Sequence, residues 1–138
     1  MIRRQLINFQ NRSVDVRVGL GAFDELSRMF ASAVGKPKRA MVVWNSASSD
    51  RFDEVVEHAL VDAGFAVSQF SLEVSPAGAT LADADAIFGA LSASGITCDD
   101  LVVAVGDAAT CSVVCWCANQ WCGRTECALP VSWARRCV

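Results

Sequence analysis

One short run of residues limits the possible folds of this chain more than any other feature of the sequence. Leu101–Val105 reads Leu-Val-Val-Ala-Val, so every position is apolar rather than every second one. A strand of this kind needs cover on both faces, as at the centre of a parallel sheet that helices flank. Gly106 follows directly and predicts a turn into another helix. The chain is therefore expected to contain a parallel α/β sheet.

Strand and helix patterns alternate along the preceding residues. Arg39–Trp44 is a second apolar strand, and Ala66–Leu72 has a weaker strand pattern. Apolar residues at helical spacing predict three helices, which bury Phe23, Leu26, Met29, Phe30 and Val34; Phe52, Val55, Val56, Ala59, Leu60 and Ala63; and Leu81, Ala84, Ile87, Phe88 and Leu91. Thr80, with Asp83 three residues later, predicts the start of the third helix. This alternation is typical of a Rossmann-like, doubly wound and mainly parallel sheet.

The N-terminal residues predict a β-hairpin in addition to this sheet. In Ser13–Val18, valines alternate with polar residues, which is the period of a half-buried strand. Ile2–Phe9 is the expected partner strand, and the turn between them is expected at Asn11-Arg12. The fold class predicted from the residues is therefore α/β with an N-terminal β-hairpin.

Length and charge narrow the classes of protein further. With 138 residues, 53% of them hydrophobic, the chain is long enough for a core, and residues 1–138 are expected to form a single domain. The net charge is −3 and no basic run alternates with aromatic residues, which argues against a nucleic-acid partner. No apolar run is long enough to span a membrane, and the first residues lack the apolar stretch of a signal peptide. A cytoplasmic protein with neither a membrane nor a nucleic-acid partner is expected.

Six of the seven cysteines lie in the last 28 positions. An odd number of cysteines in a cytoplasmic chain argues against a disulfide framework. Cys111, Cys115 and Cys122 share a face if the segment around them is helical, but zinc or an iron–sulfur cluster needs a second pair, which is absent unless Cys122 and Cys127 form it. Buried thiols in a packed helix are the simpler interpretation, so no metal site is predicted. His58 lies off the apolar stripe of its helix and is expected to be solvated.

Ligands of doubly wound sheets bind beyond the carboxyl ends of the strands. Here those ends lead into Asn45–Ala47, Ser75–Thr80 and Gly106–Ser112. Glycines at such a turn let backbone N–H groups approach a pyrophosphate. The third loop has one glycine with Asp107 beside it, and an aspartate repels phosphate unless it binds a ribose hydroxyl. The residues favour an ordinary turn there, with a nucleotide site as the alternative.

Four segments carry a resemblance to a known family. They are the Gly-Leu-Gly after the hairpin, Arg39–Phe52, Gly64–Val67 and Asp99–Gly106, of which the last is the most specific. Together with the order of elements, they resemble the N-terminal, NAD-binding domain of 3-dehydroquinate synthase over nearly the whole chain. The resemblance implies an NAD cofactor, a divalent metal held by a second, helical domain, and a phosphate-eliminating lyase of the shikimate pathway and aromatic amino acid biosynthesis. The positions that it matches to cofactor-binding residues are Asn45, Thr80, Gly106, Asp107 and Ser132.

The sequence departs from the family where the family holds its ligands. Asn45–Ser48 aligns with an Asp-Ser-Asn-Val loop of the family. Pro76 and Ala79 align with a glutamate and a lysine. Gly106–Ser112 keeps only the first glycine of a Gly-Gly-Gly-x-x-Gly-Asp motif, with Ser112 at the aspartate. The helical domain, which supplies a glutamate and two histidines to the metal, is expected to be absent. We therefore expect NAD binding to be weak or lost, no divalent metal, no catalytic residue, and no activity of this chain alone.

Two functions of different class remain open. The first is a 3-dehydroquinate synthase-like domain that works only in a longer chain or with a partner, and the second is a non-catalytic interaction or folding module derived from that family. Trp116, Trp121 and Trp133 lie with the late cysteines in residues 111–138, so this segment is expected to form a homodimer or a complex with another chain. Within it, Leu129–Val138 has neither strand nor helix periodicity.

Overall fold

The computed structural model describes residues 2–10, 12–33, 39–47, 52–97, 99–122 and 128–131. The elements in chain order are β1 (Arg3–Phe9), β2 (Arg12–Val18), the 3-10 helix η1 (Ala22–Glu25), α1 (Leu26–Ala33), β3 (Arg39–Asn45), α2 (Phe52–Asp62), β4 (Ala66–Leu72), α3 (Leu81–Ala93), β5 (Leu101–Val105), α4 (Ala108–Cys122) and β6 (Ala128–Val131). None of the helices in the described ranges combines the length and the apolar character needed to cross a membrane.

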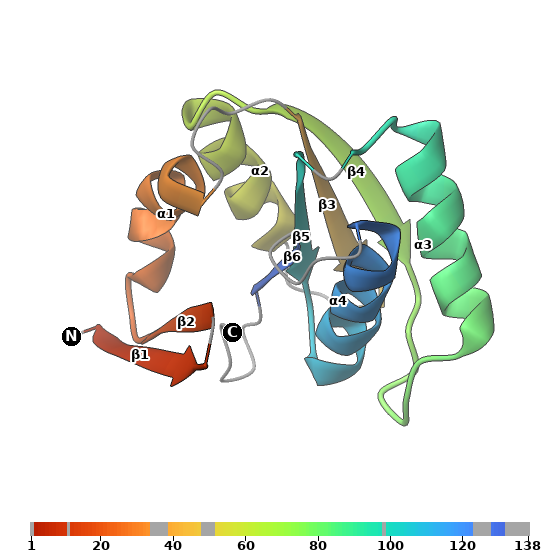
Figure 1. Cartoon of the computed structure of the whole chain (residues 1–138), viewed down its shortest axis with the longest axis horizontal. Coiled ribbons are helices and arrows are strands. Elements are labelled where there is room, and N and C mark those ends of the chain that lie inside the picture. Colours follow the sequence, from red (N-terminus) through yellow and green to blue (C-terminus); the bar gives the residue numbers. More distant parts are fainter. Residues whose placement is uncertain are drawn as a thin grey trace.

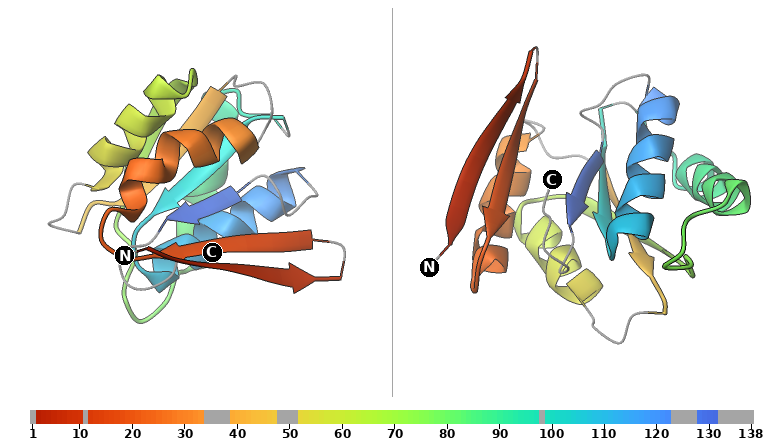
Figure 2. Two further views of the ribbon diagram at one scale, coloured as in Figure 1. Left: turned by 90° about the vertical axis from the view of Figure 1, so that its left-hand side faces the viewer. Right: turned by 90° about the horizontal axis from the view of Figure 1, so that it is seen from below.

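Four strands form one parallel sheet in the order β4-β3-β5-β6. β5 pairs with β3 from Ala40↔Leu101 to Trp44↔Val105, and β6 pairs with its other side. Every residue of β5 is buried, as its sequence predicts. Helices α1 and α2 cover one face of the sheet, and α3 and α4 cover the other (Figure 1, Figure 2). The predicted α/β architecture with a parallel sheet is confirmed.

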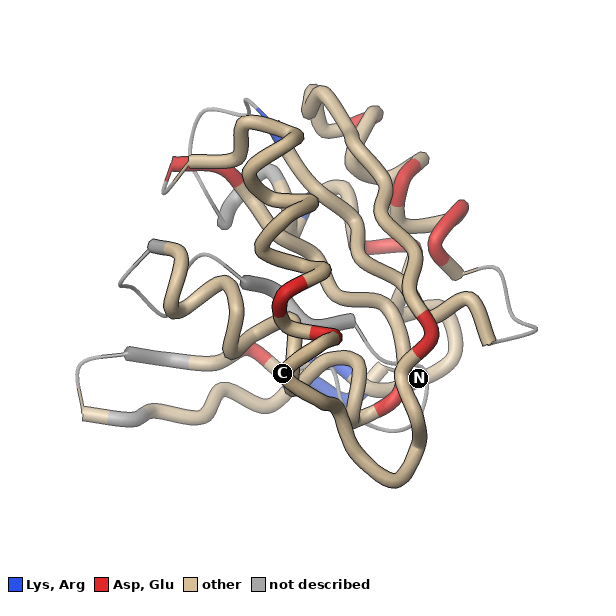
Figure 3. Tube along the Cα trace, turned by 90° about the vertical axis from the view of Figure 1, so that its right-hand side faces the viewer, with Lys and Arg blue, Asp and Glu red and all other residues tan. Residues whose placement is uncertain are grey.

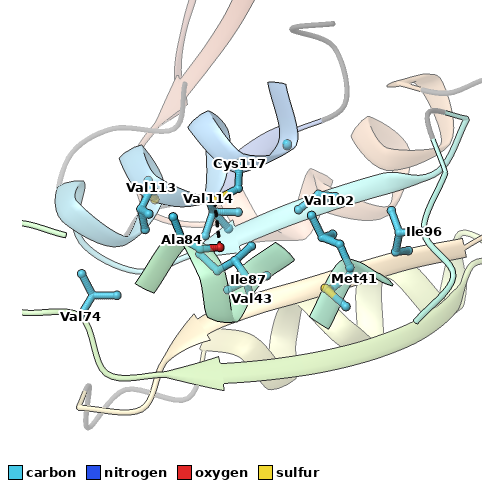
Figure 4. Close-up of a cluster of buried hydrophobic side chains, with 14 residues drawn as sticks. Met41, Val43, Val74, Ala84, Ile87, Ile96, Val102, Val113, Val114 and Cys117 are labelled. Carbon is cyan, nitrogen blue, oxygen red and sulfur yellow. Dashed lines mark hydrogen bonds between the residues drawn. The ribbon is translucent and has the colours of Figure 1, made fainter. Parts of the chain in front are cut away.

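Two apolar layers follow from the alternation of side chains along β3. Met41 and Val43 pack on the side of α3 and α4, where they join apolar residues of β5 and of both helices (Figure 4). Ala40 and Val42 pack on the opposite side, against α1 and α2. Successive side chains of a strand point to opposite faces of the sheet, so a continuous apolar run contributes side chains to both apolar layers.

The predicted hairpin is also present, but Arg12, which was expected in the turn, is the first residue of β2 and pairs with Phe9. β1 and β2 pair antiparallel along their full lengths and form a separate two-stranded sheet beside α1 (Figure 2). The Asp15 carboxylate forms ion pairs with Arg4 at 3.0 Å and with Arg17 at 3.1 Å, and Arg17 also pairs with Glu25 of η1. A hairpin alone is marginally stable in water, and the Arg17–Glu25 pair connects it to the rest of the chain. The hydrogen bond from Arg17 holds the pKa of Asp15 below its ordinary value.

Helix α3 begins and ends where its sequence predicts. The Thr80 hydroxyl accepts a hydrogen bond from the Asp83 N–H, and the Asp83 carboxylate accepts one from the Thr80 N–H, which is a capping box. Beyond the helix, Gly95 has a φ of 66°, a left-handed conformation that favours glycine.

The residues after α4 correct one expectation. Ala128–Val131 forms the edge strand β6, although Leu129–Val138 has no strand periodicity in the sequence. The strand has only four residues, and Pro130, which cannot donate to a ladder, is one of them. Alternation cannot be recognised over so short a segment, and pairing with β5 decides its conformation.

Of the predicted apolar stripes, Val34 lies outside the described residues, and two of the described positions point to solvent instead. Val55 on α2 is 44% exposed, and Leu81 at the start of α3 is 82% exposed. Both lie at the margin of the stripe that their buried helix neighbours define. Helical spacing predicts the direction of the buried face, but the packing partners decide its width.

Candidate functional site

The connections of the sheet define the place to look for a site. From β3 the chain passes through α2 to β4 on one side, and then through α3, on the opposite face, to β5 on the other side of β3. The direction of winding therefore reverses between β3 and β5. In open α/β sheets, ligands bind at the carboxyl ends of the strands at such a point. Asn45 is the last residue of β3, and Gly106 and Asp107 follow β5, so three of the predicted cofactor positions lie at this end.

Asn45 connects the three loops at this end of the sheet. Its side chain is 6% exposed, and its amide Nδ2 donates to the Val74 carbonyl oxygen and to the Thr110 Oγ1, both at 3.2 Å. Its Oδ1 accepts the N–H of Ala47 at 3.0 Å. The amide therefore has partners at its nitrogen and its oxygen, all within the chain.

Asp107 caps helix α4. Its Oδ1 accepts the backbone N–H of Thr110 at 3.0 Å and the Thr110 hydroxyl at 2.8 Å, while its carbonyl oxygen accepts the N–H of Cys111 at 3.0 Å. This is the geometry of an N-cap aspartate. The negative charge lies at the positive end of the helix dipole, where it is favourable by about 0.3–1 kcal/mol. The ordinary-turn interpretation of this loop is the one that the contacts support.

Gly106 is close to the same threonine. A Cβ atom added at Gly106 would lie 2.9 Å from the Thr110 Cβ and 3.1 Å from its Oγ1. The space beside the glycine is thus occupied by Thr110, and Gly106 is required here by the packing of the first turn of α4.

These contacts allow a test of whether the residues fit the pyrophosphate of NAD. A pyrophosphate at a helix N-terminus needs unused N–H donors and space beside the glycines. Asp107 already places a carboxylate on the first turn of α4, Thr110 fills the space beside Gly106, and Asn45 is engaged with the protein. The described residues do not fit a dinucleotide at this end of the sheet.

The two other predicted cofactor positions lie elsewhere. Thr80 uses its N–H and its hydroxyl in the capping box with Asp83, at the start of α3. Ser132 lies outside the described residues. The structure therefore brings together Asn45, Gly106 and Asp107, through Thr110.

The cysteines and the histidine of the described segments form no metal site. No group of three His, Cys, Asp or Glu side chains in those segments could hold an ion. Burial raises the pKa of the Cys115 and Cys117 thiols to about 11, so both are neutral at physiological pH. The Cys117 thiol contacts the Ala84 carbonyl oxygen at 3.7 Å inside the core (Figure 4). The His58 side chain is 84% exposed, as predicted, and lies 4.0 Å from Asp62.

Thr110 is the residue that sequence reasoning missed. It accepts from Asn45, donates to Asp107 and fills the space beside Gly106. The Asp-x-x-Thr spacing at the start of a helix was a signal, because an N-cap side chain binds the N–H of the third helical residue. The contact with Asn45 had no local signal, because 65 residues separate the two positions.

Comparisons with known proteins find solved structures of similar fold. No family model and no curated protein sequence matches the chain. A crystal structure of 2-deoxy-scyllo-inosose synthase is similar, with a TM-score of 0.77 and 15% identity over 94% of this chain and 36% of that one. A second structure, 2-deoxy-scyllo-inosose synthase with carbaglucose-6-phosphate, NAD+ and Co2+, has a TM-score of 0.69 and 12% identity over 94% of this chain and 34% of that one.

A third similar structure is the 2-epi-5-epi-valiolone synthase of Streptomyces hygroscopicus subsp. jinggangensis 5008 with NAD+ and Zn2+ bound. Its TM-score is 0.58, with 14% identity over 75% of this chain and 28% of that one. These neighbours are cyclases of the dehydroquinate synthase-like class, so the resemblance predicted from the sequence is confirmed at the level of the fold. The chain spans about a third of the length of the structures it matches.

Proposed function

We propose that this chain is a dehydroquinate synthase-like domain with a doubly wound, Rossmann-like sheet that binds NAD weakly or not at all and does not cyclise sugar phosphates alone. One observation carries the proposal: the hydrogen bonds that run from the Val74 carbonyl through Asn45 and Thr110 to Asp107. They occupy the position where a doubly wound sheet holds its ligand.

Electrostatics gives the main reason for weak NAD binding. A pyrophosphate carries negative charge, and at the start of α4 it would face the Asp107 carboxylate. In a partly desolvated site this repulsion opposes binding. The Asp107 carboxylate also already lies at the positive end of the α4 dipole, which would otherwise favour a bound phosphate. A dinucleotide would have to displace the cap, at a cost of about 1 kcal/mol, before making its own contacts.

The proposed lack of cyclase activity rests on the resemblance to the family. Pro76, Ala79 and Ser112 stand where the family has charged residues, and all three are exposed. Cyclisation with phosphate elimination develops charge that positioned groups must stabilise, and uncharged side chains at these positions cannot do so. The reaction of the parent family, in the shikimate pathway and aromatic amino acid biosynthesis, is thus the ancestral activity in this proposal.

A second candidate is an enzyme domain completed by a longer chain or by a partner. It is favoured by the coverage of the neighbours, because about two thirds of each cyclase chain has no counterpart in these residues. The hydrogen bonds that join Asn45, Thr110 and Asp107 argue against it. Additional residues would leave the Asp107 carboxylate at the start of α4, where it opposes a pyrophosphate. For this reason the non-catalytic module is the preferred function.

The proposed location is the cytoplasm. The thiols of Cys115 and Cys117 are free, which suits a reducing compartment. Fractionation of cells that express the tagged chain tests this, and recovery in an oxidising compartment would contradict it.

An assay of phosphate release tests the proposed function. The purified chain is incubated with NAD and either Zn2+ or Co2+, with 3-deoxy-arabino-heptulosonate 7-phosphate and with glucose 6-phosphate in separate reactions. A complete 3-dehydroquinate synthase serves as the positive control. No release above the buffer rate is expected, because groups that act as a unit are not replaced by the remaining ones. Release that depends on NAD would overturn the proposal.

A further inference from the structure

The outer strand of the N-terminal hairpin has an unpaired edge within the described part of the chain. β1 (Arg3–Phe9) pairs with β2 on one side, and no other described strand joins it. β2 lies between β1 and α1 in Figure 1 and in the right-hand view of Figure 2, so the open edge of β1 is directed away from α1. A strand edge of this kind carries N–H and C=O groups that can pair with another strand.

β1 lacks the features that usually protect an edge from pairing. It has seven residues in an unbroken register with β2, without a proline or a bulge. Its two charges, Arg3 and Arg4, lie at one end, and residues 5–10 carry no charge. In the charge-coloured tube of Figure 3, the hairpin is accordingly tan over most of its described length. A long, regular and mostly uncharged edge is a surface for the addition of a further strand.

The hairpin also contributes no side chain to the two buried layers of the parallel sheet. None of the side chains in residues 2–20 whose burial the structure describes is buried, and Leu6, Val18 and Leu20 are exposed. A two-stranded hairpin alone is marginally stable in water, whereas three or more strands with an apolar face can be stable. Additional strands on the β1 edge would therefore stabilise the hairpin.

We propose that two copies of this chain associate through their β1 strands, which pair antiparallel about a two-fold axis at Leu6. This register opposes all seven residues of β1 to those of the second copy, with Leu6 facing Leu6. The two hairpins then form one four-stranded antiparallel sheet. A two-fold contact of this kind is closed, so it gives a dimer and no fibre. The proposal does not depend on the Asn45 network, because β1 belongs to a separate sheet.

The arginines of β1 favour this antiparallel register. With the axis at Leu6, Arg4 lies opposite Asn8 of the second copy, four residues from the other Arg4. At about 3.4 Å per residue, the two Arg4 positions are about 14 Å apart along the strands, beyond the Debye length of about 8 Å at physiological salt. Parallel pairing without an offset would instead place each arginine directly opposite its copy, which is unfavourable.

An acidic segment of another protein fits this edge less well than a second copy does. Arg4 already forms an ion pair with Asp15 of β2 at 3.0 Å, which balances its charge within the hairpin. Residues 5–10 offer no charge to an acidic or a basic partner, whereas a second copy brings the same uncharged stretch of the same length. Of the two contacts expected from the sequence, a homodimer and a complex with another chain, this edge favours the homodimer, with β1 as its contact in place of residues 111–138.

Sedimentation velocity of the full chain tests the association. A reversible dimer is expected to form within about 1–100 µM protein at about 0.15 M salt, and a chain that stays monomeric throughout would overturn the proposal. Leu6→Lys places two like charges directly opposite one another, so it is expected to raise the dimer dissociation constant at least about tenfold. Leu81→Lys, which introduces the same charge at an exposed leucine of α3, is the matched control and leaves the dissociation constant unchanged.

Mixing two variants tests the position of the axis. Leu6→Lys and Leu6→Glu are each expected to associate weakly, whereas an equimolar mixture forms a heterodimer, because opposite charges then face one another. Leu6 is opposite Asp15 in the hairpin. If Leu6→Glu does not fold for this reason, the Leu6→Lys dimer is expected to return at about 1 M salt, which screens the repulsion.

Three results would contradict the β1 contact. The first is a Leu6→Lys variant that dimerises as the wild type does. The second is a mixture with no more dimer than the separate variants, when both fold. The third is a dimer that Trp116→Ala dissociates, because Trp116 lies on α4 and within residues 111–138.

Discussion

The side-chain amide of Asn45 donates a hydrogen bond to the hydroxyl of Thr110 at 3.2 Å, across a sequence separation of 65 residues. This contact joins the end of β3 to the first turn of α4. The same nitrogen reaches Val74 in the segment after β4, so a single buried amide holds together three loops that follow three strands. In a sheet of this kind these loops usually hold a ligand, and here they hold one another.

The first prediction concerns the Asn45 amide. Asn45→Ala removes both donors and leaves the Val74 carbonyl oxygen without this partner, so the free energy of unfolding is expected to fall by about 1–3 kcal/mol. Urea unfolding measures the change, and Ser46→Ala, at an exposed neighbouring position, is the control. Equal stability of the two variants would show that the network contributes nothing.

The second prediction compares two glycines. Gly106→Ala places a Cβ atom 2.9 Å from the Thr110 Cβ, so it is expected to destabilise the fold by about 1–3 kcal/mol. Gly89→Ala on α3 meets no atom within 4 Å and removes a helix-interior glycine, so it is expected to stabilise by about 0.5–1 kcal/mol. Thermal unfolding of the two variants gives the signs, and a stabilising Gly106→Ala would refute the packing role of this glycine.

The third prediction concerns the helix cap. Asp107→Ala is expected to lower the free energy of unfolding by about 1 kcal/mol, whereas Asp107→Ser keeps an N-cap oxygen and loses less. Asp85→Ala, an exposed acidic position inside α3, is the control for the change in net charge. The cap interpretation fails if Asp107→Ala and Asp85→Ala have the same melting temperature.

The fourth prediction is a pH dependence of the hairpin. Hydrogen bonds from Arg17 and Arg4 hold the pKa of Asp15 below its ordinary value of 3.8. A lowered pKa means that the carboxylate stabilises the folded state above this ordinary value, and that the contribution disappears as the pH falls through the folded-state pKa. The stability difference between the wild type and Asp15→Asn should therefore shrink in acid. A difference that stays constant from pH 7 to pH 2 would contradict the ion pairs.

The strands and helices that could be predicted from the sequence are those whose pattern is long enough to read. β5 and α3 are examples, because a run of apolar residues and a capping box are local signals. β6 could not be predicted, because four residues that include Pro130 carry no period and β5 decides their pairing. Val55 and Leu81 show a second limit, since the width of a buried stripe depends on neighbours that the helix itself does not specify.

The candidate site could also be predicted only in part. The positions Asn45, Gly106 and Asp107 follow from the resemblance and from the rule that loops after parallel strands hold ligands. Their actual contacts do not follow from it, because Thr110, which the resemblance does not single out, bonds to Asn45 and Asp107 and lies against Gly106. A motif predicts the location of a site, whereas hydrogen bonds between distant residues decide whether its polar groups already have partners within the chain.

The most direct test of the account is calorimetric titration of NAD into the full chain at neutral pH. The hydrogen bonds that run from Asn45 through Thr110 to Asp107 predict no measurable binding, which corresponds to a dissociation constant above about 1 mM. A dissociation constant in the low micromolar range, about 7–8 kcal/mol of binding free energy, would contradict the account, because the start of α4 would then accept a pyrophosphate despite Asp107.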